Sequence, residues 1–316
     1  MDASSSCARG AAGTAVAVPT LKLSVLMPVH NEKATVSAAV ADVLGMSLEH
    51  PFELVIVDDG STDGSSELLD SIDDERVVVY RHPINLGKGA AVLSAASLAS
   101  GSHFVIFDAD GEYRAADLAR MFRLICEGTA EIVFGVRMFG MNTVYRSFRY
   151  ALGNRATTFV ANLLFDACLS DLHSCLKMVP AEVFRSLNLT RANFGLDSEI
   201  TAELLRRGYR PYEVPVSYVS RSHAEGKKLT WRDGLDCLRV LATVRLRPPV
   251  TGGPLVVERD ARAYVKRPFD RRPSLHVIGD ERGEGGTVVP LDDEVDLRDA
   301  GRTVPGPIAQ ATEAKW

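Results

Sequence analysis

The stretch on which the fold of this chain depends is Phe104-Val-Ile-Phe-Asp-Ala-Asp-Gly-Glu112. Its first four residues are aromatic or β-branched, and this pattern predicts a buried strand. Three carboxylates follow at alternate positions, where the strand should end. In open α/β sheets ligands bind beyond the carboxyl ends of the strands, and proteins hold Mg²⁺ with one or two carboxylates plus substrate phosphates. Asp108, Asp110 and Glu112 are therefore candidate ligands of a metal that carries a nucleotide diphosphate, unless they form only a polar turn.

The composition is that of a soluble globular protein, with 46% hydrophobic and 24% charged residues among 316. The net charge of −5 argues against a general nucleic-acid binder. Five widely spaced cysteines without a C-x-x-C pair predict reduced thiols in a cytosolic protein. No apolar run reaches the roughly 18 residues of a membrane-spanning helix, and residues 1–20 lack the pattern of a signal peptide.

The first half of the chain alternates between predicted strands and predicted helices. Strands are expected at 21–28, 52–57, 76–80, 104–107 and 131–134. Helices are expected at 34–44, 65–72 and 115–126, and a further helix opens at 85–89 and runs to 99. Such alternation implies βαβ units and a parallel sheet. The polar loops after three of these strands should then open on one edge of the sheet.

The pattern changes after residue 135. We expect one long helix at 143–165, a strand at 174–179, helices at 181–187 and 198–207, and an extended segment at 212–219. Pro215 indicates that the extended segment lies at a sheet edge. An amphipathic helix is expected at 230–246, with an apolar face formed by Leu235, Leu238, Leu241 and Ala242.

These elements predict an α/β fold with a mostly parallel sheet flanked by helices. We expect a single domain over residues 21–247. Residues 1–20 should form a disordered segment, and the composition of residues 248–316 predicts a mostly disordered tail.

Asp58 and Asp59 follow the second predicted strand. Carboxylates at this position can accept hydrogen bonds from a nucleobase or a ribose. They can equally serve the turn itself, in which Ser61 or Thr62 caps the following helix.

Two further features come after the third and the fifth strand. Asn85-Leu-Gly-Lys-Gly89 resembles an anion-binding loop, in which glycines let backbone N–H groups approach an anion and Lys88 supplies charge. The loop lacks the spacing of a P-loop or of a dinucleotide-binding motif. Arg137 either reaches the diphosphate or is a solvated surface arginine.

Five motifs in one order give the chain a resemblance to a known family. They are Pro28-Val-His-Asn-Glu32, Val57-Asp-Asp-Gly-Ser61, Asn85-Leu-Gly-Lys-Gly89, Asp108-Ala-Asp110 and Arg221-x5-Lys227. Together they are similar to family 2 glycosyltransferases with the GT-A (Rossmann-like) fold. The branch that the chain resembles most is that of the polyprenyl-phosphate (dolichyl-phosphate) sugar synthases, over about residues 23–247.

The resemblance implies roles for individual residues. The nucleotide sugar would contact Pro28, His30, Glu32, Val57, Asp59, Lys88, Asp108, Ala109 and Arg137. The metal, Mg²⁺ or Mn²⁺, would be held by Asp108, Asp110 and Glu112, and the catalytic residues would be Asp110, Arg221 and Lys227. His30 stands where the family usually has Tyr, and Glu112 where it often has Gln. The segment Asp171-Leu-His-Ser-Cys-Leu-Lys177 matches a family segment that normally has Gly in place of Cys175.

The implied reaction is inverting transfer of a hexose from a nucleotide sugar, with UDP preferred over GDP by analogy. A lipid phosphate is already ionised near neutral pH, so it needs only positive charge to hold it. The cluster of Arg221, His223, Lys227 and Lys228 fits such an acceptor, polyprenyl phosphate, unless it forms only a solvated loop before a helix. A sugar hydroxyl of a polysaccharide or glycolipid would instead need a general base, for which Asp197 and Glu199 are candidates, unless they only complement a helix start. A subunit that binds a nucleotide sugar without turnover is a further alternative.

A polyprenyl acceptor lies in a membrane, so we expect a protein peripheral to the cytoplasmic face of the cell membrane. Either the helix at 230–246 rests on the bilayer surface or a membrane protein partner recruits the enzyme. Alternatively, the leucine face of this helix packs on the sheet.

Overall fold

The computed structural model describes residues 21–137, 143–144, 147–193, 195–221, 231–248, 275–279 and 286–290 of the chain. The strands are β1 (Leu23–Val29), β2 (Phe52–Asp58), β3 (Val77–Arg81), β4 (His103–Ile106), β5 (Val133–Val136), β6 (Thr143–Val144), β7 (Lys177–Pro180), β8 (Tyr212–Pro215), β9 (Tyr218–Val219), β10 (Leu275–Gly279) and β11 (Gly286–Pro290). The helices are α1 (Val36–Leu44), α2 (Ser65–Asp70), α3 (Lys88–Leu98), α4 (Ala116–Cys126), α5 (Phe148–Phe165), α6 (Ala181–Ser186), α7 (Gly195–Arg206) and α8 (Trp231–Leu246).

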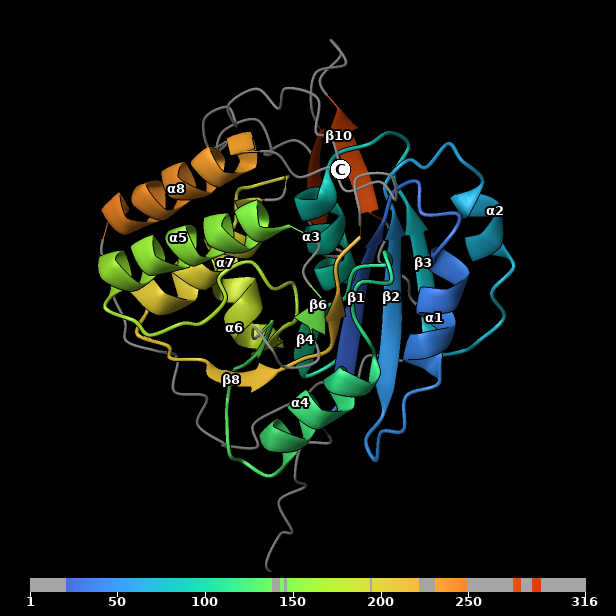
Figure 1. The fold of residues 1–316 in the computed structure, drawn as a ribbon. Helices are drawn as coiled ribbons and strands as arrows, with labels where there is room; N and C mark the ends of the chain where they lie inside the picture. Colours follow the sequence, from blue (N-terminus) through green and yellow to red (C-terminus); the bar gives the residue numbers. More distant parts are fainter. Residues whose placement is uncertain are drawn as a thin grey trace, which may run out of the picture.

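Seven strands form the central sheet, in the order β3-β2-β1-β4-β7-β5-β8 (Figure 1). All of them run parallel except β7, which is antiparallel to both of its neighbours, β4 and β5. The predicted α/β fold with a mostly parallel sheet is therefore confirmed. Pro215 lies in β8, the edge strand, where its missing N–H costs no ladder hydrogen bond.

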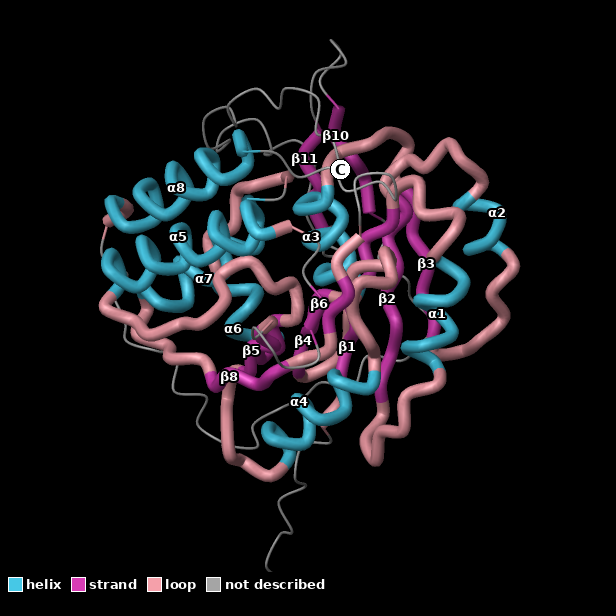
Figure 2. The backbone as a smooth tube through the Cα atoms, viewed as in Figure 1, coloured by secondary structure: helices cyan, strands magenta, loops and turns pink. Residues whose placement is uncertain are grey.

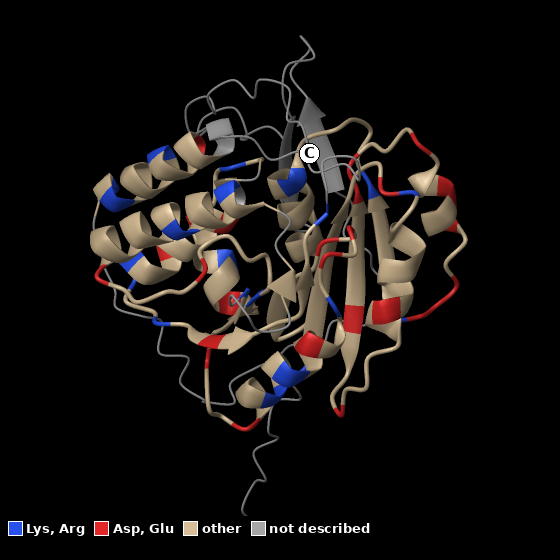
Figure 3. Cartoon of the chain, viewed as in Figure 1, with Lys and Arg blue, Asp and Glu red and all other residues tan. Residues whose placement is uncertain are grey.

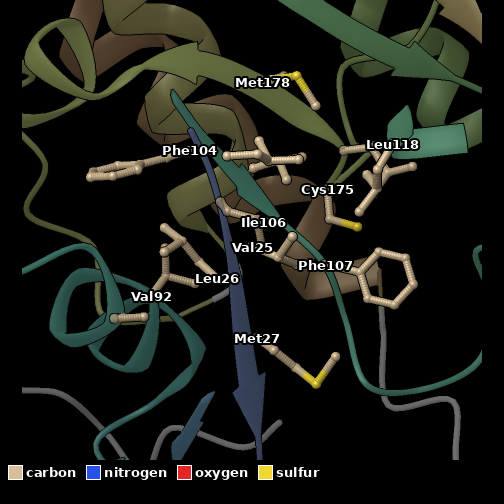
Figure 4. Packing of buried hydrophobic residues seen from close by; sticks show 14 of the residues in the cluster. Val25, Leu26, Met27, Val92, Phe104, Ile106, Phe107, Leu118, Cys175 and Met178 are labelled. Atoms are coloured by element: carbon tan, nitrogen blue, oxygen red, sulfur yellow. The ribbon is translucent and has the colours of Figure 1, made fainter. Parts of the chain in front are cut away.

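The core lies around β1 and β4, which pair at the centre of the sheet. Every residue of β1 is buried, and Phe104 and Phe107 are each only 1% exposed. Figure 4 shows side chains of β1 and β4 packed together with Val92 of α3 and Leu118 of α4. Because burial of a large apolar side chain stabilises a fold by about 2 kcal/mol, this pair of strands fixes the sheet that carries the polar loops.

Three helices, α5, α7 and α8, gather at one side of the molecule, whereas α1 and α2 lie at the other side, near β2 and β3 (Figure 2). α3 packs against β1 and β2, and α4 packs against β5. α5, α7 and α8 contact one another and enclose a second hydrophobic cluster, which includes Phe165, Leu172 and Leu241.

The predicted helix at 143–165 is wrong at its beginning. Thr143 and Val144 form β6, which pairs in parallel with β9. Ser147 has an extended backbone, with φ −145° and ψ 120°, and α5 begins only at the next residue. Residues 143 and 144 thus belong to a short sheet, and the spacing of apolar residues alone does not distinguish a strand from a helix here.

The apolar face predicted for the last helix is also corrected. From residue 234 onward, where the side chains of α8 are described, the buried residues are Cys237, Val240, Leu241 and Val244. Leu235 is 45% exposed, and Ala242 is exposed as well. Of the expected face, Leu241 is fully buried, because α5 and α7 cover the side of the helix centred on Leu241 and Val244.

The predicted cap of α2 differs as well. Its N-cap residue is Gly64, in a left-handed conformation with φ 97°, and not Ser61 or Thr62. Asp63 accepts hydrogen bonds from the N–H and hydroxyl of Ser65, at 2.9 and 2.6 Å, and so satisfies the helix start.

Of the predicted tail, the structure describes only residue 248, β10 and β11. The two strands pair antiparallel, with Val277 opposite Val288. The prediction for the rest of residues 248–316, and that for residues 1–20, lies outside the described residues. None of the helices within the described ranges is long and apolar enough to cross a membrane.

Candidate active site

The loops that follow β1, β2, β3 and β4 meet at one edge of the sheet, as the alternation of elements predicts. Asp59 after β2 is bonded to the loop after β3, and Lys88 at the end of that loop is bonded to Asp108 after β4. Glu32 after β1 and Asp110 after β4 share the same arginine, Arg221. The polar residues of four sheet loops thus form one connected group.

Asp59 holds the loop after β3 in place. Its side chain is fully buried, and its oxygens accept hydrogen bonds from the N–H groups of Leu86 and Gly87, at 2.9 and 2.8 Å. The same carboxylate contacts Nδ1 of His82 at 2.5 Å. Gly87 has φ 98°, a conformation that L-residues rarely adopt. The glycine loop therefore does present N–H groups to an anion, but in this structure the anion is Asp59.

Gly89 completes the loop by a close backbone contact. Its N–H donates to the carbonyl oxygen of Ala192 at 2.7 Å, and an added Cβ would collide with the carbonyl oxygen of Arg191. Only glycine lets the start of α3 approach this segment. The N–H groups from residue 86 to 89 for which contacts are described are thus used inside the protein, and the predicted phosphate-binding role rests on the Lys88 side chain.

His30 links the ends of β1, β2 and β3. Its Nδ1 lies 2.8 Å from the carbonyl oxygen of Asp59, and its Nε2 lies 3.1 Å from Nδ2 of Asn85. Because a carbonyl only accepts and an amide nitrogen only donates, Nδ1 carries the proton and Nε2 accepts. The imidazole is therefore oriented by its neighbours at the edge of the sheet.

Lys88 is a buried cation between two carboxylates. Its Nζ lies 2.7 Å from Asp108 and 3.5 Å from Asp197. Burial would lower the pKa of Lys88, but the two carboxylates outweigh it and raise the pKa above its ordinary value. The side chain therefore stays charged and places positive charge beside the predicted diphosphate site.

Asp197 lies between two lysines. Its Oδ1 is 4.0 Å from Nζ of Lys177, and it is buried without a hydrogen-bond partner among the described residues. Burial would raise the pKa of Asp197, but Lys88, Lys177 and His173 lower it further than burial raises it. The carboxylate is thus ionised and buried. It lies in the first turn of α7, so it also complements the helix start, the alternative expected for it from the sequence.

Asp110 and Glu32 are bridged by Arg221. The guanidinium lies 3.0 Å from Asp110 and 3.1 Å from Glu32. Burial, together with the charges of Asp108 and Glu112, raises the pKa of Asp110 to about 7. Arg221 alone does not balance the negative charge gathered here.

Glu112 is held by two protein donors. Its oxygens accept hydrogen bonds from the hydroxyl of Tyr218 and from the N–H of Arg221, both at 2.7 Å. The carboxylate therefore positions the segment that carries Arg221. Sequence reasoning missed Tyr218, because a tyrosine in a short edge strand follows no motif.

Arg137 is mostly buried and is paired, so it is not a solvated surface arginine. Its guanidinium makes two hydrogen bonds to Asp171, at 2.7 and 2.8 Å, and lies over the ring of Tyr218. Burial would raise the pKa of Asp171, but Arg137 outweighs it and holds the pKa well below its usual range. Asn154 of α5 donates a further hydrogen bond to Asp171 at 2.9 Å.

The remaining predicted residues have simpler surroundings. Glu199 is fully buried and accepts from the N–H groups of Thr190 and Arg191 and from Arg247, at 2.8, 2.9 and 2.7 Å. Pro28 and Val57 are opposite each other in β1 and β2, and both side chains are buried. Ala109 is 2% exposed. Lys227 and Lys228, like His223, lie outside the described residues.

Some of the carboxylates at this edge of the sheet are suitable ligands for a divalent cation. Among the described residues no group of three or more His, Cys, Asp or Glu is arranged as a metal cluster, and Glu112 already binds two protein donors. Asp108 and Asp110 remain, and two carboxylates are sufficient for Mg²⁺ when a diphosphate supplies further oxygens. Glu32, Asp108, Asp110 and Glu112 face Lys88 and Arg221, so the carboxylates outnumber the cations. Burial and then this excess raise the pKa of Asp110, and a divalent cation would relieve the excess of negative charge.

The raised pKa of Asp110 predicts a pH effect on stability in the absence of metal. A carboxyl whose folded pKa is above its unfolded value binds protons more tightly when folded, so its contribution to stability improves as the pH falls from 8 towards 5. We expect the free energy of unfolding of Asp110→Asn at pH 8 in EDTA to exceed that of wild type by on the order of 2 kcal/mol. The advantage should shrink at pH 5. Urea unfolding at both pH values measures it, and an Asn variant less stable than wild type at pH 8 would contradict the charge imbalance.

Two solved structures share the architecture. Glucosyl-3-phosphoglycerate synthase from Mycobacterium tuberculosis, in complex with Mn²⁺, UDP and phosphoglyceric acid, matches with a TM-score of 0.56 at 18% identity, over 74% of this chain and 81% of that chain. TarS from S. aureus, in complex with UDP-GlcNAc, matches with a TM-score of 0.50 at 17% identity, over 73% and 68%. The fold is thus that of the GT-A glycosyltransferases.

Sequence comparison then gives the family. The glycosyl transferase family 2 model matches residues 24–187, and the chain belongs to this family of glycosyltransferases that act on nucleotide sugars. Glycosyltransferase AglJ from Haloferax volcanii is 27% identical over 246 residues, which cover 78% of this chain and 73% of that protein. Glycosyltransferase AglD from the same organism is 27% identical over 257 residues, and the match covers 77% of this chain but only 40% of AglD.

Proposed function

We propose that this protein is an inverting glycosyltransferase that moves a hexose from a nucleotide-diphosphate sugar to polyprenyl phosphate. The observation that carries the proposal is the position of Arg221. Its guanidinium lies between Glu32 and Asp110, and it opens the basic segment that continues to Lys228. A basic acceptor loop thus begins at the carboxylates where the diphosphate of the donor would bind.

Asp108 and Asp110 would hold the divalent metal, Mg²⁺ or Mn²⁺, together with the donor diphosphate. When bound, such a metal acts as a Lewis acid that neutralises the leaving diphosphate. Lys88 adds a positive charge that the pairing with Asp108 keeps in place. Support for the donor class comes from the family, and GT-A structures such as the two neighbours hold UDP or UDP-GlcNAc, one of them with Mn²⁺. A UDP-sugar is our preferred donor over a GDP-sugar.

Arg137 is proposed to act near the phosphates through its fixed position. Its pairing with Asp171 leaves it buried and charged, and the Tyr218 ring below it keeps the guanidinium in one plane. Tyr218 also fixes Glu112, and Glu112 accepts a hydrogen bond from the N–H of Arg221. This chain of contacts ties the orientation of the acceptor loop to the loop after β4.

The acceptor phosphate is proposed to bind Arg221, Lys227 and Lys228. A phosphate monoester is ionised near neutral pH, so the reaction at the sugar carbon needs no general base. The side chain of Arg221 is 23% exposed, so it can be reached from solvent. To contact an acceptor phosphate, Arg221 would have to break its ion pair with Glu32 or with Asp110. The charge of the bound donor would compete with these ion pairs.

One observation favours a sugar hydroxyl as the second candidate acceptor. Asp197 is ionised, buried beside Lys88, and has an oxygen without a hydrogen-bond partner among the described residues. That oxygen has the capacity of a general base, whereas the oxygens of Glu199 are filled by protein donors. A nucleotide-sugar-binding subunit without turnover is the remaining alternative.

The proposed acceptor places the protein at the cytoplasmic face of the cell membrane, alone or with a membrane protein partner. The helix predicted at 230–246 is a poor candidate for resting on the bilayer through the predicted leucine face. The buried side of α8 packs against α5 and α7, so its leucine at 241 is used inside the protein.

The proposal is tested by sugar transfer from radiolabelled UDP- and GDP-sugars into a membrane lipid extract, with Mn²⁺ or with EDTA. We expect metal-dependent label in a lipid that releases the sugar in mild acid, as glycosyl phosphates do. Acid-stable label would show a hydroxyl acceptor and direct attention to Asp197. No label from any donor, although the protein binds one of them, would favour the non-catalytic subunit.

A further inference from the structure

α5 carries large apolar side chains that face solvent along its whole length. They form one stripe, which we call the α5 stripe: Phe148, Leu152, Phe159 and Leu163, with exposed fractions of 73%, 53%, 67% and 73%. Their spacing of four, seven and four residues places them on a single face of an α-helix. The opposite face, with Ala161 and Phe165, packs into the second hydrophobic cluster.

A continuous exposed stripe of this kind is uncommon on soluble monomers and marks an interaction surface. The charge of the helix narrows the choice of partner. Within its 18 residues α5 has no Asp or Glu, and it has two exposed arginines, Arg149 and Arg155 (Figure 3). Helical geometry places Arg155 within the stripe and Arg149 at its border.

We propose that the α5 stripe docks this protein on an anionic lipid bilayer, with α5 lying in the plane of the headgroups. An apolar face with arginines and no carboxylates is the pattern of helices that bind membrane surfaces. The stem of Arg155 can lie along the apolar chains while its guanidinium reaches lipid phosphates. A second copy of the chain fits less well, because a two-fold contact would bring the arginines of both stripes together without an acidic partner on α5.

The docking surface is connected to the candidate active site. Asn154, on the side of α5 opposite the stripe, donates a hydrogen bond to Asp171, which holds Arg137. The helix that would meet the lipid headgroups is therefore bonded to Asp171, the partner of the proposed phosphate-site residue Arg137. The inference rests on the proposed function in one respect: a lipid acceptor is the reason for the protein to bind a membrane. It replaces α8 with α5 as the helix that touches the lipid.

The test is co-sedimentation of the full chain with vesicles, in the absence of nucleotide sugar and acceptor. We expect binding to vesicles of phosphatidylcholine mixed with phosphatidylglycerol, and weaker binding to phosphatidylcholine alone. The double variant Phe159→Ser/Leu163→Ser should reduce partitioning by at least about tenfold. Arg149→Gln/Arg155→Gln should reduce binding to the anionic vesicles only, and salt should do the same.

Val79→Ser is the matched control. Val79 is an apolar residue that is 37% exposed, and it lies on the edge strand β3, outside the α5 stripe. It should leave vesicle binding unchanged, and thermal unfolding should confirm that each variant is folded. Stripe variants that bind vesicles like wild type would overturn the inference. So would variants that change the mass measured by light scattering from dimer to monomer while vesicle binding persists. Because transfer is not measured here, failure of docking and failure of the proposed reaction are separate results.

Discussion

Asp110→Asn is expected to lower turnover by on the order of 1,000-fold while the protein remains folded. The substitution removes one of the two carboxylates available to the metal and keeps the size of the side chain. It also removes a charge that the surroundings disfavour, since burial, Asp108 and Glu112 raise the pKa of Asp110 to about 7. The variant should therefore be at least as stable as wild type at pH 8. Loss of activity without loss of stability is the combination that a site residue, and not a structural residue, produces.

Initial rates with the donor found in the transfer assay measure this prediction, with and without Mn²⁺. Asp70→Asn is the matched control, because Asp70 pairs with Arg81 at 3.1 Å but is 65% exposed and lies away from the metal carboxylates. It should leave the rate unchanged. An Asp110→Asn enzyme with full activity and unaltered metal dependence would remove Asp110 from the metal site.

Asp171→Asn is expected to have the largest effect on stability, about 3–5 kcal/mol in the free energy of unfolding. Asp171 is 1% exposed and Arg137 is 12% exposed. Neutralising the aspartate leaves a mostly buried guanidinium without its counter-charge. It also removes the charge from the group that accepts the hydrogen bond of Asn154. The control Asp70→Asn, in an exposed ion pair, should cost less than about 1 kcal/mol.

The pH dependence of this effect has a definite sign. Arg137 holds the folded pKa of Asp171 well below its usual range, although burial opposes this. The pair therefore contributes stability above the unfolded pKa of about 4, and the contribution is lost as the pH falls towards the folded pKa. Urea unfolding at pH 7 and at pH 3 should show a smaller difference between wild type and Asp171→Asn in acid. An equal difference at both pH values, or a cost at pH 7 no larger than that of the control, would show that the ion pair is not what stabilises this region.

The regular half of the fold follows from the sequence because its signals are local. Short, mostly apolar runs such as residues 25–29 and 105–107 predict strands of a sheet covered on both faces, because glycine-containing turns follow, with glycines at 60, 87 and 111. The beginning of α5 and the buried face of α8 depend on long-range contacts. β6 needs β9, and α8 turns towards α5 and α7, so neither is visible from periodicity alone.

In the candidate site, too, the features set by local sequence could be predicted and those set by long-range contacts could not. The carboxylates after β4 could be predicted, because the position of Asp108 and Asp110 at a strand end is a local fact. The partners of Asp59, Glu112 and Arg137 could not. Each is satisfied by a residue at least 27 positions away, such as Leu86 for Asp59 or Tyr218 for Glu112. Sequence reasoning assigned these side chains to ligands, and the structure shows that protein groups already bind them.

We expect the carboxylates at this edge of the sheet to bind a nucleotide diphosphate together with a divalent metal. Calorimetric titration of UDP and GDP into the wild-type protein, in Mn²⁺ and in EDTA, measures this binding. The titration should give heat of binding in Mn²⁺ that is absent in EDTA and absent in Asp110→Asn. Binding of equal affinity in EDTA, or no binding of either nucleotide in Mn²⁺, would contradict this expectation.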